Sequence, residues 1–358
     1  MSPANDIDQP AAPNRPGRGR IKCVVWDLDD TLWDGVLLED SHVRIRPEVV
    51  ETITHLDRLG VLHSVASRND RDAALTRLRT AGLDDYFLYP QISWNPKSQL
   101  VARIADELNI GLGTVAFVDD QPFERAEVAN AHPEVLCVDA ADAWSLRHRP
   151  EFQPRFVTDE SRLRRTMYRS DAHRRRAEQQ FTGTSEEFLA TLNMELTITP
   201  AQPGDLQRAE ELTVRTNQLN ATGRPYTYQE LNDARRRDNA LLLVMSLRDR
   251  FGDYGTIGLA LADLTDHVWR LRLLLVSCRV MSRGVGTVLL GHVAALANNH
   301  GAQLLADFVD TGRNRMMYLT YVFSGFHEVN HDGDVVIFSA DPDRLPAPPD
   351  YLTITTRA

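Results

Sequence analysis

The sequence has only three cysteines, Cys23, Cys137 and Cys278. Spacing this wide gives neither a disulfide framework nor the paired thiols of a zinc site. No apolar run approaches the roughly 18 residues that a membrane span needs. Near the start of the chain, no apolar core of a signal peptide follows the basic residues. We therefore expect a cytoplasmic protein without a membrane partner.

An excess of positive charge is absent as well. The net charge is -10 and the isoelectric point is near 5.6, which argues against a nucleic-acid partner. Hydrophobic content of 42% and charged content of 25% are ordinary for a globular protein, and the length suits two or three domains. Residues 1–20 combine Pro, Asn, Gly and Arg with few large apolar side chains, so we expect a disordered N-terminal tail.

What the sequence does have is an acidic cluster directly after a short apolar run. Val24 to Trp26 has the composition of a buried parallel strand. Asp27, Asp29 and Asp30 follow within four positions, and alternation puts Asp27 and Asp29 on one side of an extended chain. Carboxylates this close repel one another and favour a bound hard cation. The pair predicts a metal ligand beside an acid or base, with a solvated loop as the alternative.

Three further polar clusters follow elements of the same kind. The apolar run 61–66 ends in Ser67, Lys97 precedes a helical pattern, and a strand over 114–118 runs into Asp119-Asp120. Alternating strands and helices predict a doubly wound parallel sheet, whose sites gather at the carboxyl ends of the strands. We expect all four clusters to meet in one crevice.

In this order the four clusters resemble the motifs of the haloacid dehalogenase (HAD) phosphotransferase superfamily. The resemblance implies that Asp27 is the nucleophile that takes a phosphoryl group and that Asp29 is the acid and base. The matching positions are Asp27-x-Asp29-x-Thr31, Ser67, Lys97 and Asp119-Asp120.

The same resemblance assigns the remaining roles. Ser67 and Lys97 would bind and neutralise the phosphoryl oxygens as catalytic residues. Mg²⁺ would be held by Asp27, Asp119 and the backbone carbonyl of Asp29. Substrate contacts are expected from two neighbouring polar side chains, Thr31 and Asn69.

Segment lengths in this domain indicate an open site. Residues 31–66 and 68–96 leave 36 and 29 residues between successive motifs, and crossover helices use part of each. A large inserted cap has no room. An open crevice suits a macromolecular partner, or a second domain that serves as the lid.

The first domain, residues 21–140, is expected to end near Val138-Asp139-Ala140, and residues 141–190 indicate a helical connector. The connector is dense in arginine. It is either a solvated helix face or a docking surface for an acidic partner such as an acyl carrier protein. The arginines are Arg162, Arg164, Arg165, Arg169, Arg174, Arg175 and Arg176.

Residues 191–345 begin a new series of strand-like segments, at 196–199, 240–247, 256–262 and 268–276. The last leads into the turn 277–286 and then a helix, an arrangement that makes an anion site of backbone N–H groups. It resembles the α+β GNAT acyltransferase fold, whose corresponding turn binds the pyrophosphate of coenzyme A. Met281 replaces the usual Gln or Arg, which leaves coenzyme A binding open. The resemblance implies binding roles for Arg283, Gly284, Gly286 and Asn314, and residues 346–358 are expected as a C-terminal tail.

Cys278 lies at the end of an apolar strand, beside Arg279, Arg283 and a helix start. Such neighbours favour a thiolate and predict a nucleophile; a packing role is the alternative. Cys23 and Cys137 lie in apolar strand-like segments and are interpreted as packing residues.

Over residues 20–345 the chain resembles the FkbH-like proteins of polyketide gene clusters, which fuse a HAD domain to a GNAT-like domain. The resemblance implies that D-1,3-bisphosphoglycerate, a small phosphorylated three-carbon substrate, is dephosphorylated. Its glyceryl group would be captured on a cysteine and passed to the phosphopantetheine thiol of an acyl carrier protein, for methoxymalonyl-type units. Thr216-Asn217 and Asp253 would line the acyl site, or serve as turn and capping residues. The blocks that carry the resemblance are 26–35, 117–125, 216–220, 249–253 and 277–281.

Three functions remain open at this point. The first is the glyceryl transferase and phosphatase. The second is a phosphatase whose second half only docks a partner, in which case Cys278→Ala leaves all activity intact. The third is a non-catalytic scaffold, which the intact Asp27, Asp29 and Lys97 disfavour.

Overall fold

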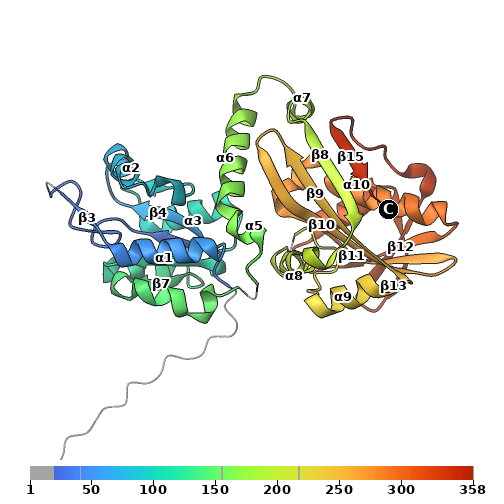
Figure 1. The fold of residues 1–358 in the computed structure, drawn as a ribbon, viewed down its shortest axis with the longest axis horizontal. Coiled ribbons are helices and arrows are strands. Elements are labelled where there is room, and N and C mark those ends of the chain that lie inside the picture. Colours follow the sequence, from blue (N-terminus) through green and yellow to red (C-terminus); the bar gives the residue numbers. More distant parts are fainter. Residues whose placement is uncertain (1–19, 41, 155, 217, 358) are drawn as a thin grey trace, which may run out of the picture. The chain divides into compact units, whose positions relative to one another are not determined.

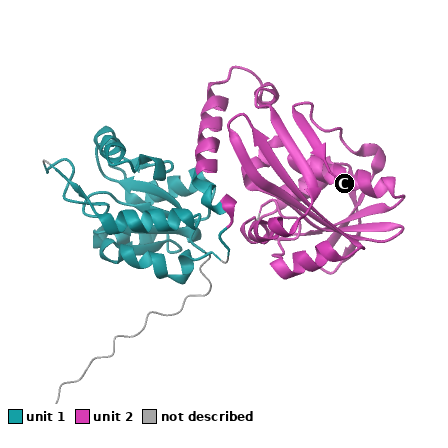
Figure 2. Ribbon diagram, viewed as in Figure 1, with its two compact units in different colours: residues 1–157, 161–165 teal, residues 158–160, 166–358 magenta. Residues whose placement is uncertain are grey.

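The computed structural model describes residues 20–357 except Ser41, Arg155 and Asn217 (Figure 1). The expected N-terminal tail therefore lies outside the described residues, apart from Arg20. The chain divides into two compact units (Figure 2). Unit 1 comprises Met1–Val157 and Ser161–Arg165, and unit 2 comprises Thr158–Glu160 and Thr166–Ala358. Within the ranges described, no helix is both long enough and apolar enough to cross a membrane.

Unit 1 is built on a five-stranded parallel sheet in the order β5-β4-β1-β6-β7. All four residues of β1 are buried, as expected for a central strand with helices on both faces. Because the strands run in one direction, their carboxyl ends share one edge of the sheet, and the predicted doubly wound class is confirmed. The strands are β1 (Cys23–Trp26), β4 (Leu62–Ser67), β5 (Gln91–Ile92), β6 (Val115–Asp119) and β7 (Leu136–Asp139).

Helices follow the strands of unit 1 in the expected alternation. They are α1 (Pro47–Arg58), α2 (Arg71–Thr80), α3 (Lys97–Leu108) and α4 (Pro122–Ala131). Apart from α1, the helices and strands that the described residues form between β1 and β4 are only the hairpin strands β2 (Trp33–Asp34) and β3 (Arg44–Ile45). The prediction that no large cap is inserted is confirmed for the part of unit 1 that is described.

The sequence indicated that the first domain ends near Ala140, but unit 1 continues past that residue. The 3₁₀ segments η3 (Ala140–His148) and η4 (Pro150–Phe152) follow β7 and bury Ala143, Leu146 and Phe152 in the same core as the sheet. These apolar side chains are spaced irregularly, so their pattern resembled the start of a connector.

Unit 2 is built on an eight-stranded mixed sheet in the order β13-β14-β12-β11-β10-β9-β8-β15. Alternate residues of β9 enter different cores: Leu243 and Met245 pack in the core with α10, whereas Leu242 and Val244 pack in the core with α8 and α9. Helices therefore cover both faces, and the predicted α+β class is confirmed. The strands are β8 (Met194–Pro200), β9 (Ala240–Asp249), β10 (Gly252–Leu264), β11 (Val268–Val276), β12 (Gln303–Val309), β13 (Phe326–Asp332), β14 (Val335–Ala340) and β15 (Leu352–Thr356); the helices are α8 (Leu206–Arg215), α9 (Tyr228–Arg236), α10 (Val285–Asn299) and α11 (Arg315–Phe323).

The segment 346–358, expected as a tail, contains β15, which pairs in parallel with β8 from Leu352↔Met194 to Thr356↔Ile198. A proline-rich stretch precedes it and hid the short Leu-Thr-Ile-Thr-Thr strand pattern in the sequence.

The connector is helical, as predicted, with α5 (Asp159–Arg162), α6 (Arg164–Gln180) and α7 (Ser185–Ala190). Its arginines, however, do not form one solvated or docking face. In unit 1, Arg165 pairs with Asp57 at 2.9 Å. In unit 2, the buried Arg174 donates from Nε and Nη2 to both carboxylate oxygens of Asp249, at 2.6 and 3.0 Å. Part of the arginine run therefore stabilises each unit from within.

Candidate active site

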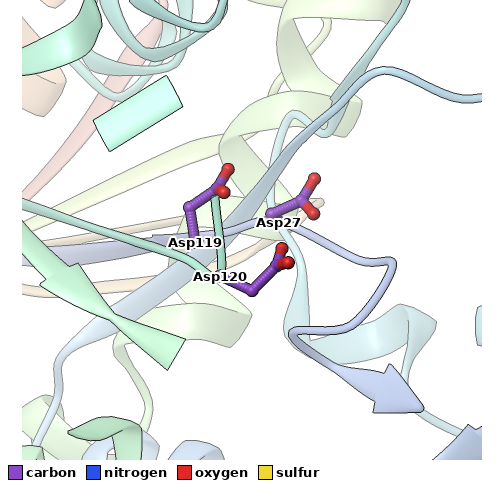
Figure 3. Close-up of side chains that lie close together, drawn as sticks. All are labelled: Asp27, Asp119 and Asp120. Carbon is purple, nitrogen blue, oxygen red and sulfur yellow. The ribbon is translucent and has the colours of Figure 1, made fainter. Parts of the chain in front are cut away.

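Three carboxylates converge at the carboxyl edge of the unit 1 sheet. Asp27 follows β1, Asp119 ends β6, and Asp120 comes next (Figure 3). The N–H of Asp27 donates to the carbonyl of Val118 at 2.9 Å, which holds the two strand ends together. One oxygen from each of the three carboxylates lies within 4.8 Å of the others. The predicted convergence of acidic side chains from separate strands is what the structure shows.

Lys97 supplies the balancing positive charge. Its Nζ lies 2.5 Å from Asp27 Oδ1 and 2.9 Å from both Asp119 Oδ2 and Glu124 Oε2, and its side chain is 1% exposed. It is the first residue of α3, which places it at the sheet edge. Lys97 is one of only two lysines in the sequence, in which most basic residues are arginines. A compact ammonium can contact three carboxylates at once, and a planar guanidinium would not replace it in this arrangement.

The pKa values of these groups follow from their burial. Burial alone would lower the pKa of Lys97, but the charges of Asp27, Asp119 and Glu124 raise it above its ordinary value. Burial raises the pKa of Asp27, and the charge and hydrogen bond of Lys97 oppose that rise. Burial raises the pKa of Asp119 to about 7, with Lys97 opposing the rise and Asp27 adding to it. The cluster thus holds more negative charge than Lys97 neutralises, which favours a second cation.

The donor set fits a hard divalent cation, because carboxylate oxygens are the ligands that Mg²⁺ prefers. The carboxylate group contains the predicted Asp27 and Asp119, and its third member is Asp120. The ligand predicted from Asp29 is its backbone carbonyl, and that role stays a prediction. Thr31 explains the position of Asp120: the Asp120 N–H donates to the Thr31 hydroxyl at 3.1 Å. Thr31 is fully buried, and the contact made by its hydroxyl is with Asp120; its predicted contact with substrate stays a prediction.

The Asp29 carboxylate is fixed by three hydrogen-bond donors. Its Oδ1 accepts from Trp33 Nε1 at 2.8 Å and from the Leu37 N–H at 3.0 Å, and its Oδ2 accepts from Asn69 Nδ2 at 2.8 Å. Asn69 was predicted to bind substrate, but in this structure its amide orients Asp29. A carboxylate held from both oxygens keeps one direction, as an acid or base must.

Ser67 and Glu124 complete the surroundings. Ser67 is buried and its side chain hydrogen-bonds Asp27, which lowers the pKa of that carboxyl. Sequence reasoning missed Glu124, whose Oε1 lies 3.0 Å from Arg68 Nη1 while its Oε2 faces Lys97. Its position in the first turn of α4, five residues after Asp119, is the signal that could have placed it at this edge.

In unit 2, Cys278 begins the 3₁₀ segment η6 (Cys278–Arg283) between β11 and α10, and its side chain is half-buried. The Arg279 guanidinium donates to the Tyr254 carbonyl at 2.8 Å. Arg283 is 7% exposed, and among the residues described its Nη1 has no hydrogen-bond partner. Gly284 has φ of +71° directly before α10, a conformation that favours glycine.

Asn314 is buried, and its contacts are with the backbone. Its Nδ2 donates to the carbonyls of Asn220, Ala221 and Val309 at 2.9, 3.2 and 2.9 Å. These bonds hold the segment 219–221 between β11 and β12: the Val276 N–H donates to the Leu219 carbonyl, and the Val309 N–H donates to the Ala221 carbonyl. Its expected role in substrate binding stays a prediction, as do those of Arg283, Gly284 and Gly286.

Two other positions have separate outcomes. Asn217, predicted to bind substrate, lies outside the described residues. The Asp253 carboxylate accepts from the Gly255 N–H at 2.6 Å, as a turn residue does, which agrees with the second of its two interpretations.

The family model of the haloacid dehalogenase-like hydrolases matches residues 34–132. Residues 34–132, which lie within unit 1, are therefore similar to hydrolases of this kind. A search of curated proteins found no match. Among solved structures, the N-terminal part of a Bacteroides fragilis protein, containing a phosphatase domain complexed with Mg, is 26% identical with a TM-score of 0.34. The match covers 37% of this chain and 40% of that one, so this chain spans less than half of that structure.

Two acetyltransferases are also similar. The ribosomal-protein-S18-alanine N-acetyltransferase of Escherichia coli is 17% identical with a TM-score of 0.33, and the match covers 43% of this chain and 97% of that one. The PaiA N-acetyltransferase of Thermoplasma acidophilum, in complex with coenzyme A, is 15% identical with a TM-score of 0.33, over 40% of this chain and 98% of that one.

Proposed function

We propose that the enzyme is a Mg²⁺-dependent phosphatase of a small phosphorylated three-carbon acid, and that it loads the acid's glyceryl group onto an acyl carrier protein. The observation that carries the phosphatase part is the position of Lys97 Nζ between Asp27 and Asp119, at 2.5 and 2.9 Å. Phosphoryl transfer needs an in-line nucleophile and positive charge on the phosphoryl oxygens, and little other covalent chemistry from the protein.

The phosphoryl step uses Asp27 and Asp29. The Asp27 carboxylate attacks phosphorus, the bond from phosphorus to the ester oxygen breaks, and Asp29 gives a proton to that oxygen. Water then gives a proton to Asp29 and cleaves the aspartyl phosphate, which releases phosphate and restores Asp27. Lys97 and Ser67 are placed beside Asp27 to bind the phosphoryl oxygens.

Asp27, Asp119 and Asp120 would hold Mg²⁺ through carboxylate oxygens. When bound, the ion offsets the negative charge that spreads over the phosphoryl oxygens during transfer. The raised pKa values of Asp27 and Asp119 support such a site, because Lys97 does not fully compensate their buried negative charges.

The acyl step would use Cys278. Its thiolate attacks C1 of D-1,3-bisphosphoglycerate, the bond from C1 to the phosphate oxygen breaks, and phosphate leaves. The carrier's phosphopantetheine thiol then attacks the thioester, and its proton is taken up as Cys278 leaves. The product suits a methoxymalonyl-type polyketide unit. The buried Nη1 of Arg283, which has no hydrogen-bond partner in the part of the chain that is described, supports an anion near this turn.

A second candidate is a phosphatase whose unit 2 only docks a carrier. Segment 219–221 and Asn314 favour it, because the chain itself fills the gap between β11 and β12. The Arg279 guanidinium also has partners of its own, the Tyr254 carbonyl and the Met167 sulfur.

The deciding experiment is intact-mass analysis of the enzyme and a carrier protein with D-1,3-bisphosphoglycerate and Mg²⁺. We expect a glyceryl adduct on both wild-type proteins, none with Cys278→Ala, and an unchanged adduct with the matched control Cys137→Ala. Phosphate release without an adduct in the wild type would leave the second candidate. Full phosphate release by Asp27→Asn would remove both.

A further inference from the structure

Arg68 is a partly exposed cation beside the unit 1 site, and the preceding mechanism gives it no role. It directly follows Ser67 at the end of β4. Its Nη1 lies 3.0 Å from Glu124 Oε1, and its Nε donates to the Asn95 carbonyl at 3.4 Å. Its side chain is 36% exposed, whereas that of Lys97 is 1% exposed.

Glu124 ties the two cations together. One of its oxygens lies 2.9 Å from Lys97 Nζ and the other lies 3.0 Å from Arg68 Nη1, so a single carboxylate separates them. Lys97 faces the nucleophile Asp27 on the inner side. Arg68 therefore lies one carboxylate away from Lys97, on its more exposed side, and Glu124 and the Asn95 carbonyl fix its direction.

The charges of the site give this position its importance. Asp27, Asp119 and Glu124 contact the buried ammonium of Lys97, and Asp120 lies beside Asp27 and Asp119. A substrate with more than one anionic group therefore meets strong repulsion. Lys97 serves the phosphoryl group under attack. A second oxyanion on the same molecule needs a cation farther out, and a guanidinium offers a planar pair of N–H donors that matches carboxylate or phosphate.

We propose that Arg68, held by Glu124, is a subsite for a second oxyanion group of the substrate, a few bonds from the phosphoryl group that is cleaved. The proposal rests on the phosphatase function proposed for unit 1. It makes Arg68 the residue that selects phosphorylated acids or bisphosphates over phosphate esters with neutral remainders.

The test uses three substrates that all have a three-carbon backbone. Glycerol 3-phosphate has no second oxyanion, 3-phosphoglycerate adds a carboxylate, and 1,3-propanediol bisphosphate adds a phosphate. Arg68→Gln removes the charge but keeps a donor for the Asn95 carbonyl. The matched control is Arg71→Gln, because Arg71 is exposed, donates to the Pro90 carbonyl at 3.1 Å and carries the same charge.

For Arg68→Gln we expect KM to rise at least tenfold for a substrate with a second oxyanion, while kcat/KM for glycerol 3-phosphate stays within about threefold of wild type. If KM rises for 3-phosphoglycerate, Arg68 binds the carboxylate; if KM rises for 1,3-propanediol bisphosphate, Arg68 binds the second phosphate. Arg68→Lys should restore part of the loss, and Arg71→Gln should resemble wild type.

Equal losses on all three substrates would overturn the proposal, since Arg68 would then only support Glu124 and Lys97. No loss on any substrate, or no wild-type preference for a second oxyanion, would overturn it too. Wild-type turnover of glycerol 3-phosphate that Asp27→Asn abolishes keeps the phosphatase function standing in those cases. Absence of phosphate release from all three substrates would remove the phosphatase function and the subsite together.

Discussion

The ammonium nitrogen of Lys97 lies 2.5 Å from a carboxylate oxygen of Asp27, although 70 positions separate the residues in the chain. The same nitrogen contacts Asp119 and Glu124. One side chain therefore compensates carboxylates that come from the ends of β1 and β6 and from α4. We therefore expect both the stability and the proposed chemistry of unit 1 to depend on Lys97.

Replacing Lys97 by Met should lower the free energy of unfolding of unit 1 by about 3–5 kcal/mol, because buried carboxylates lose their partner. Added Mg²⁺ should restore part of this loss, since the ion binds the folded cluster. Urea unfolding with and without Mg²⁺ measures both effects. Arg79→Met is the control, because the Arg79–Asp84 pair is exposed and worth about 0–1 kcal/mol. Equal losses in the two variants would contradict the prediction.

Asn69→Ala should reduce kcat about 10- to 100-fold with little change in KM, because Asp29 loses the donor on its Oδ2 and with it a fixed direction. Trp33→Phe, which removes the Nε1 donor to Oδ1, should act in the same way. Steady-state kinetics with glycerol 3-phosphate checks this, with the exposed Gln99→Ala as control. A rise in KM at constant kcat would instead show that Asn69 binds substrate.

Asp120 and Asp29 should differ in their link to the metal. Asp120→Asn should raise the Mg²⁺ concentration for half-maximal activity at least about tenfold, since Asp120 belongs to the carboxylate group. Asp29→Asn should lower kcat and leave that concentration unchanged. Mg²⁺ titrations of both variants measure the difference. The reverse result would make the Asp29 carboxylate, and not that of Asp120, the metal ligand.

His63 should make unit 1 less stable in acid. It is fully buried, its Nδ1 accepts from Trp26 Nε1 at 3.1 Å, and burial lowers its pKa to about 3. The unfolded chain takes up a proton near pH 6.5, which the folded state resists. Stability is therefore fully present above about pH 6.5 and falls toward pH 3, by up to about 1.4 kcal/mol per pH unit.

The difference between wild type and His63→Gln isolates this effect, because the glutamine oxygen still accepts from Trp26 but does not titrate. Urea unfolding followed by tryptophan fluorescence between pH 4 and 7.5 should give a shallower slope for the variant. The raised pKa of Asp119 acts with the opposite sign in both proteins and so cancels. Identical slopes would show that His63 does not set the acid sensitivity.

Arg174→Met should destabilise unit 2 by about 3–5 kcal/mol, because Asp249 stays buried without its bidentate partner. The hydroxyl of Tyr254 and the N–H of Phe251 would still donate to Asp249, which favours the lower end of that range. Arg176→Met, two residues along α6 and exposed, should change the free energy of unfolding by less than about 0.5 kcal/mol. Thermal or urea unfolding of the two variants decides the matter.

The sequence predicted the inner part of the site because its residues are tied to strand ends. Asp27, Ser67 and Asp119 close buried apolar runs, and parallel strands bring such ends to one edge whatever the details of the helices. Glu124 was missed because its contact with Lys97 depends on how α4 packs against α3, which no local pattern fixes.

Other differences also come from tertiary partners. The arginine run was interpreted from composition, and the burial of Arg174 requires Asp249, which lies 75 residues away. The strand at Leu352–Thr356 is too short to identify alone and exists because β8 offers an edge. Asn314 stood at a position where the resemblance implied substrate binding, but three backbone carbonyls take its amide.

The placement of Leu219–Ala221 constrains how a long thioester arm could enter unit 2. Its backbone already bonds to Leu274 and Val276 of β11 and to Val309 of β12. A bound arm that formed backbone hydrogen bonds between these strands would first have to displace residues 219–221. It would also have to break the hydrogen bonds that Asn314 makes to Asn220 and Ala221. An arm that reaches Cys278 without such rearrangement must approach the turn by another route.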